Sequence, residues 1–107
     1  MSSTLQRIRE LVSRGEVRVS EHAYDELARD GVFATELIFS LSGASAVEDY
    51  PQYGKGPCAL VLHHLANGDR IHAVWGIPRN AASPAVLITA YRPDPARWSD
   101  DFKTRKT

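Results

Sequence analysis

The spacing of hydrophobic residues changes near Gly43, and that change limits the folds this chain can adopt. Up to that point apolar side chains recur every three or four positions, which predicts amphipathic helices over residues 4–14, 20–30 and 34–42. Beyond it, alternating patterns and short apolar runs predict strands over residues 45–50, 58–65, 70–77 and 85–92. Helices followed by strands indicate an α+β fold, in which the N-terminal helices pack on one face of a mostly antiparallel four-stranded sheet.

Capping and turn residues support these boundaries. Ser20 offers an N-cap hydroxyl to the second helix, and Gly15 and Gly31 follow the first and second helices as stop residues. The Asn-Gly pair at residues 67–68 predicts a tight hairpin between the second and third strands. Most of the sheet is therefore expected to be antiparallel.

The length and composition favour one soluble domain. A chain of 107 residues with 43% hydrophobic and 24% charged residues can form one compact core, so we expect a single domain over 1–107. The basic tail at 103–107 is expected to be mobile. The single cysteine, Cys58, excludes an intrachain disulfide, and no apolar stretch is long enough to span a membrane. We therefore expect a cytoplasmic protein with no membrane partner.

The charge balance constrains any role with nucleic acids. Thirteen basic and thirteen acidic residues give a formal net charge of zero. Proteins whose main task is to grip nucleic acid usually carry a basic surplus, because phosphate neutralisation supplies much of their affinity. Binding of RNA would therefore require a local basic patch.

Two histidines occur in the predicted hairpin. If residues 67–68 form a two-residue turn, His63 pairs with His72, whereas a three- or five-residue loop would shift the strands by one and break the pair. In the first register one face carries core residues: Cys58, Leu60, Leu62, Ile71, Ala73, Trp75 and Ile77. The orientation of His72 away from Ile71 depends only on strand alternation. His72 is either a site residue or a semi-buried histidine bonded to a neighbour, and His63 is expected at the surface or rim.

Two other segments carry polar residues in a suggestive order. On the second helix His22 and Glu26 lie one turn apart, either as part of a reaction centre or as the polar border of an amphipathic helix. At the end of the last strand, Thr89 and Tyr91 should project to one side and Arg92 to the other. Tyrosine, threonine and arginine suit phosphate recognition, although edge packing with an ion pair from Arg92 to Asp94 or Asp49 explains the same residues.

The motifs SEHAYDELARDGV, EDYP, GKGPCALVLHHLANGDRIHAVWGI and VLITAYRPDPARW follow one another over about residues 18–101. In order and spacing they resemble the bacterial domain-of-unknown-function 4258 family, which looks like a relative of the small ribonuclease toxins of the RelE and BrnT type. The chain departs from the family outline at Phe33, where a polar helix cap is expected, and at Ala73. The matched polar positions are Ser20, His22, Tyr50, His72, Thr89, Tyr91 and Asp94.

The resemblance implies helices on one side of a curved antiparallel sheet and a metal-independent endoribonuclease without a cofactor. His22 and His72 would act as acid and base in either order, oriented by Glu26 or Tyr91. Arg92, or Lys55 from the GKG loop, would steady the phosphate. Thr89 and His63 would be further substrate contacts.

Two other functions stay open at this point. The first is a non-catalytic interaction module that binds a partner protein such as an antitoxin, which the zero net charge favours. The second is a metal or small-molecule site built on His22, His63 and His72, although neither HExxH nor CxxC spacing occurs. The sequence does not indicate an oligomeric state.

Overall fold

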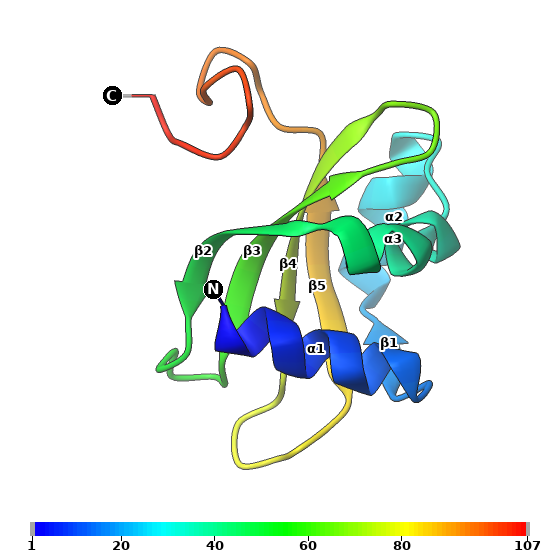
Figure 1. The fold of residues 1–107 in the computed structure, drawn as a ribbon. Helices are drawn as coiled ribbons and strands as arrows, with labels where there is room; N and C mark the ends of the chain where they lie inside the picture. Colours follow the sequence, from blue (N-terminus) through cyan, green and yellow to red (C-terminus); the bar gives the residue numbers. More distant parts are fainter. Residues whose placement is uncertain (1, 107) are drawn as a thin grey trace.

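The computed structural model describes residues 2–106, which form a mixed sheet covered on one face by helices (Figure 1). The helices are α1 (Ser3–Ser13), α2 (Glu21–Arg29) and α3 (Ala34–Ser40), and α3 continues into a 3₁₀ turn, η1 (Leu41–Gly43). The strands are β1 (Val17–Val19), β2 (Ser45–Tyr50), β3 (Cys58–His64), β4 (Arg70–Gly76) and β5 (Ala85–Tyr91). The predicted α+β class is confirmed.

The strand order is β1-β5-β4-β3-β2, in which β2 to β5 are antiparallel and β1 runs parallel to β5. The prediction of four strands was therefore one short. The missing strand, β1, lies between the first two predicted helices, and its three residues are too few to show a period. Its position depends on pairing with the edge of β5, where Ala85 N donates to Glu16 O and Ser20 N donates to Leu87 O.

The helices begin where side chains satisfy the first free N–H groups. Ser2 Oγ accepts from Leu5 N, and Ser20 Oγ accepts from Ala23 N, each at 3.0 Å. At α3 the residue before the helix is Phe33, and Glu36 Oε1 accepts from Phe33 N at 3.0 Å. The carboxylate thus caps the N–H of Phe33, whereas the Phe33 side chain offers no acceptor to the first turn of α3.

One apolar core lies between the three helices and the sheet. Trp75 of β4 is fully buried within it. The core residues of the helices are Leu5, Ile8, Leu11, Ala23, Leu27, Leu37 and Leu41, and those of the sheet include Ala59, Val61, Ile71, Ala73, Leu87 and Ala90. Burial of these side chains is the main term that holds the helical layer to the sheet.

The β3–β4 hairpin has a different register from the one expected for a two-residue turn. His63 pairs with Ile71, and Leu62 pairs with His72, so the predicted His63–His72 pair is wrong. The connection between the two strands consists of residues 65–69, and Leu65 N donates to Asp69 O across the Asn-Gly pair. As a result Cys58, Leu60 and Leu62 leave the helix-covered face, which corrects their predicted place in the core beside Ile71. His72 points away from Ile71, as predicted.

His63 is fully buried under α3, so its predicted position at the surface or rim is wrong. Trp75 Nε1 donates to His63 Nε2 at 3.0 Å, and His63 Nδ1 lies 2.8 Å from Ser40 Oγ. Because Nε2 accepts, the neutral ring carries its proton on Nδ1 and donates to Ser40. The one-residue shift of the hairpin thus makes His63 the polar link between β4 and α3.

We expect His63→Ala to lower the free energy of unfolding by about 2–4 kcal/mol, because it leaves a cavity and an unpaired Trp75 N–H in the core. Urea unfolding followed by circular dichroism measures the change. The matched control is His64→Ala, since His64 is the exposed neighbour on the same strand and should change stability by less than about 0.5 kcal/mol. Equal losses in the two variants would contradict the structural role of His63.

The same histidine should make stability depend on pH. Burial lowers the pKa of His63 from 6.5 to about 4, so between these values the unfolded chain binds a proton that the folded chain does not. The contribution of His63 to the free energy of unfolding should therefore fall as pH decreases from about 6.5 to about 4. Urea unfolding at several pH values should show a smaller decrease in His63→Gln. A decrease of the same size in both proteins would contradict this assignment.

Candidate functional site

The sheet face opposite the helices carries a groove with a volume of about 520 Å³. Its floor is apolar and comes from alternate residues of β3, β4 and β5: Cys58, Leu60, Val74, Gly76, Val86 and Ile88. Its rim is polar and consists of Glu48, Tyr50, Tyr53, Lys55, Tyr91 and Arg105. An apolar floor with a few convergent polar groups is typical of a binding site.

A β-bulge in β2 turns Glu48 toward this groove. Ala46 pairs with Val61 on the helix-covered face, but Glu48 pairs with Leu60 because Val47 is an extra residue between them. Strict alternation would have placed Glu48 on the same face as Ala46. After the bulge the alternation resumes, so Tyr50 also lies on the groove side, opposite Cys58.

A second bulge does the same in β5. Leu87 pairs with Trp75 in the core, whereas Thr89 pairs with Val74, which lines the groove. The extra residue is Ile88, and beyond it Tyr91 lines the groove while Ala90 returns to the core. Thr89 and Tyr91 therefore share one side of the strand, as predicted.

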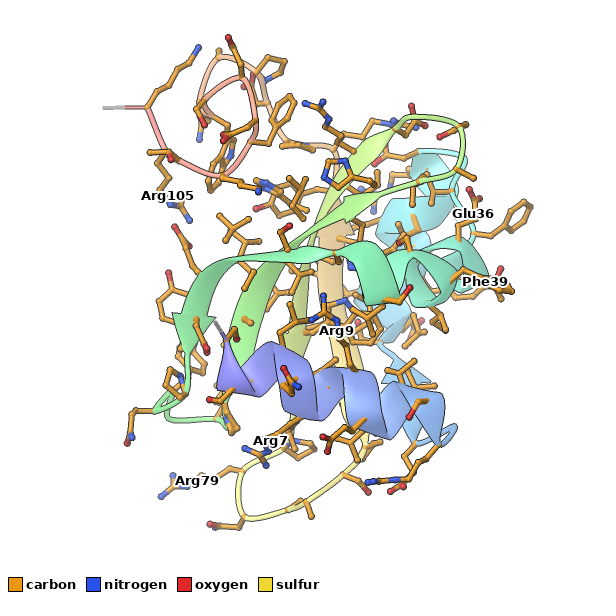
Figure 2. All side chains as sticks on the ribbon, in the orientation of Figure 1. Arg7, Arg9, Glu36, Phe39, Arg79 and Arg105 are labelled. Atoms are coloured by element: carbon orange, nitrogen blue, oxygen red, sulfur yellow. The ribbon has the colours of Figure 1, made fainter. Side chains whose placement is uncertain are left out.

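Glu48 is held as a carboxylate by two neighbours. Arg105 donates from Nε to Oε2 at 2.8 Å and from Nη2 to Oε1 at 3.0 Å, and Tyr50 OH donates to Oε1 at 2.7 Å. These hydrogen bonds, Arg105 first, lower the pKa of Glu48, and the same carboxylate raises the pKa of Tyr50. At neutral pH the groove therefore holds a charged carboxylate beside a guanidinium and a neutral phenol. Figure 2 shows Arg105 on the C-terminal segment, reaching toward β2.

Lys55 reaches the groove from the loop between β2 and β3. Its backbone O accepts from Arg79 N at 3.1 Å, so the loop is tied to the residues after β4. The next residue, Gly56, has a φ of 124°, and a Cβ there would lie 2.1 Å from Ile77 O. Only glycine fits this close backbone approach, which fixes the loop at the rim.

His72 lies at the end of the groove under the C-terminal segment. It is fully buried, contacts Tyr91 and Trp98 edge to face at 5.6 and 4.4 Å between ring centroids, and its Nε2 donates to Phe102 O at 2.8 Å. Within residues 2–106 its Nδ1 has no hydrogen-bond partner. Burial lowers the pKa of His72 below its ordinary value, so the ring is neutral and positions Tyr91 rather than facing solvent.

A second polar cluster lies at the free edge of β5, just beyond the end of β1. Glu26 of α2 accepts from the hydroxyl of Thr89, from Ala90 N at 3.2 Å, and lies 3.1 Å from His22 Nε2. The His22 side chain is 68% exposed, whereas that of Glu26 is only 22% exposed. Burial raises the pKa of Tyr91, which lies between this cluster and the groove, and the nearby carboxylates of Glu48 and Glu26 raise it further. His22 and Glu26 are therefore in contact at the β5 edge.

The predicted site residues separate into several settings. Tyr91 and Lys55 line the groove, and His72 lies buried beside Tyr91. His22 contacts Glu26, whereas His72 contacts Tyr91, Trp98 and Phe102, so the two histidines share none of these partners. Arg92 points to the other side of β5, where it contacts Asp30 O at 3.1 Å and Asp69 Oδ2 at 3.1 Å. That ion pair replaces the predicted partners Asp94 and Asp49. His63 belongs to the core.

Three residues of this region were not singled out from the sequence. Glu48 escaped because strand alternation alone does not reveal the bulge. Arg105 escaped because it lies in the tail that was expected to be mobile, and Trp98 was matched only as part of the motif VLITAYRPDPARW. In the structure Ser99 N donates to Thr104 O and Lys106 N to Arg97 O, and Arg105 lies 4.7 Å from the Trp98 ring centroid. Thr107 lies outside the described residues.

The model of the family described as "Domain of unknown function (DUF4258)" matches residues 19–92, more than two thirds of the chain. The chain belongs to this family. No curated protein and no solved structure matches it. The DUF4258 region includes both bulges, Lys55 and His22, but it ends before the segment that carries Trp98 and Arg105.

Two general findings apply to residues 2–106. No group of three or more His, Cys, Asp or Glu side chains in this range is arranged to hold a metal ion. None of its helices is long and apolar enough to cross a membrane.

Trp98→Ala should raise the pKa of His72 toward its ordinary value of 6.5, because it uncovers the ring and reduces the desolvation that favours the neutral form. NMR titration of the imidazole protons measures the midpoint. Phe39→Ala, which removes an exposed ring from α3, should leave the midpoint unchanged. An unchanged midpoint in Trp98→Ala would mean that the C-terminal segment does not control the protonation of His72.

Proposed function

We propose that this protein is a metal-independent endoribonuclease whose substrate binds in the groove. The observation that carries the proposal is the meeting of a charged carboxylate, two cations and three tyrosines around one apolar floor. Cleavage of RNA without a metal requires a base for the 2′-hydroxyl, a donor for the leaving 5′-oxygen, and positive charge at the phosphate. The groove offers a candidate for each.

In this proposal Glu48 removes the proton of the 2′-hydroxyl, which then attacks the adjacent phosphorus. Arg105 and Lys55 stabilise the negative charge that develops on the phosphate oxygens. Tyr91 donates its phenolic proton to the leaving 5′-oxygen, and His72 positions that ring. The products are a 2′,3′-cyclic phosphate and a free 5′-hydroxyl.

The form of the rim favours unpaired RNA. Tyr50 and Tyr53 are 46% and 55% exposed, so their rings are available for stacking with bases. Aromatic rings beside cations are the usual way in which proteins bind single-stranded nucleic acid. Lys55 and Arg105 also supply local positive charge for binding phosphates, although the net charge of the whole chain is zero.

The histidine assignment implied by the family resemblance gives a second version of the same reaction. His22 with Glu26 forms an exposed imidazole–carboxylate pair that could act as base at the β5 edge, with Tyr91 again as neighbour. This version follows from the resemblance to the RelE- and BrnT-type ribonuclease toxins, and a relation to them is part of this proposal. Variants of Glu48 and His22 distinguish the two versions.

We expect the purified protein to cleave single-stranded RNA in the presence of a chelator. Glu48→Gln keeps the shape and most hydrogen bonds of the side chain but removes the base, so it should lower the rate by about 100-fold or more. Tyr91→Phe should have a similar effect. Gel analysis of labelled RNA, with assay for 2′,3′-cyclic phosphate ends, measures the rate and the product.

Charge-matched controls separate phosphate binding from general electrostatics. Arg105→Gln should reduce cleavage strongly, whereas Arg7→Gln removes the same charge from α1 (Figure 2) and should leave the rate unchanged. If His22→Ala abolishes cleavage and Glu48→Gln does not, the base lies at the β5 edge. Intact RNA with the wild-type protein under all conditions would exclude the nuclease.

A further inference from the structure

Three large aromatic side chains are exposed on the helical layer, away from the groove. Tyr24 of α2 is 62% exposed, Phe33 before α3 is 74% exposed, and Phe39 of α3 is 86% exposed. Scattered exposed apolar residues are normal, but three large rings on two consecutive helices form an apolar surface that water solvates poorly. We call Tyr24, Phe33 and Phe39 the aromatic surface.

Two residues of the aromatic surface, Tyr24 and Phe33, border a hollow with a volume of about 290 Å³. Tyr24 and Phe33 form part of its wall, and the rest comes from Leu27, Ala28, Gly31, Val32 and Ala34. All of these residues are apolar or glycine apart from the Tyr24 hydroxyl. The hollow therefore suits a branched or aromatic apolar side chain from outside, in the way that pockets receive anchor residues at protein interfaces.

The charge around the aromatic surface is mainly negative. Residues 21–40 include five acidic side chains (Glu21, Asp25, Glu26, Asp30 and Glu36) and one basic side chain, Arg29, whereas the whole chain is neutral. Of the five acidic side chains, Glu26 faces the β5 edge, so four remain against the one basic side chain. Figure 2 shows Glu36 with Phe39 on the outer side of α3. Arg92 donates to the backbone O of Asp30, and its charge is paired with the carboxylate of Asp69.

This charge selects among possible occupants. Nucleic acid would be repelled by the acidic residues, and a second copy of the chain would bring two acidic surfaces together. A segment with an apolar side bordered by lysine or arginine is complementary both to the apolar hollow and to the acidic residues around it. We propose that the aromatic surface docks a basic amphipathic segment of a partner protein, which places an apolar side chain in the hollow. This proposal does not depend on the nuclease.

A synthetic helical peptide tests the complementarity directly. The probe carries leucines along one side and lysines beside them, and a reference peptide has glutamates in place of the lysines. We expect the lysine peptide to bind at least about tenfold more tightly than the reference in fluorescence anisotropy, and its NMR shifts to concentrate in residues 21–40. Equal affinity for the two peptides, no binding, or shifts spread over the groove would overturn the proposal.

Phe33→Ser is a suitable variant because serine is a better N-cap than phenylalanine, so α3 should stay folded. This variant should lower the affinity for the lysine peptide by about tenfold or more, which is the effect of losing an interface anchor. Asp25→Lys should weaken it as well and reduce its salt dependence. Tyr53→Ser removes an exposed ring from the opposite face of the sheet and should leave the affinity within about twofold.

Sedimentation of the free protein tests whether a second copy of the chain binds to the aromatic surface. We expect the wild type to be free of self-association through this surface. If it forms dimers that Phe33→Ser abolishes, the occupant is a second copy and the proposal is wrong. If Phe33→Ser and Asp25→Lys bind the lysine peptide as tightly as the wild type, the aromatic surface is not the docking site.

Discussion

The groove depends on one extra residue in each of two strands. A β-strand directs successive side chains to opposite faces, so an uninterrupted β2 would direct Glu48 into the space between sheet and helices. The bulge at Val47 brings Glu48 to the groove, within reach of Arg105, and turns Asp49 to the helix side, where it accepts from Ser2 Oγ. The bulge at Ile88 has the same effect on Tyr91, and together they give one face an apolar core and the other a set of polar groups.

The second contribution to the groove comes from the C-terminal segment. It supplies Arg105, covers His72 with Trp98, and is joined to itself by a bridge between Trp98 and Arg105. Because the family match ends at residue 92, the segment that completes the groove lies outside the matched region. The groove is therefore built jointly by the family domain and by residues that follow it.

The sequence predicted those features that local patterns determine. The α+β class, the caps at Ser20 and the orientation of His72 follow from periodicity and alternation, which act within a few residues. The remaining features depend on partners far along the chain. Strand β1 exists because β5 offers a free edge, the His63 position depends on the length of the hairpin connection, and Arg105 finds Glu48 across more than fifty residues of sequence. Of the residues around the groove, the sequence pointed to Tyr91 and Lys55, but not to the Glu48 carboxylate or the Arg105 guanidinium.

The pairing of tryptophans with histidines has a practical consequence. The chain contains two tryptophans, and each lies against a different histidine: Trp75 beside His63 in the core between the sheet and the helices, and Trp98 beside His72 under the C-terminal segment. Indole emission responds to the polarity of its surroundings. Replacing one tryptophan at a time would therefore leave a native optical reporter for each side of the sheet, so that loosening of the C-terminal segment can be followed separately from loss of the core.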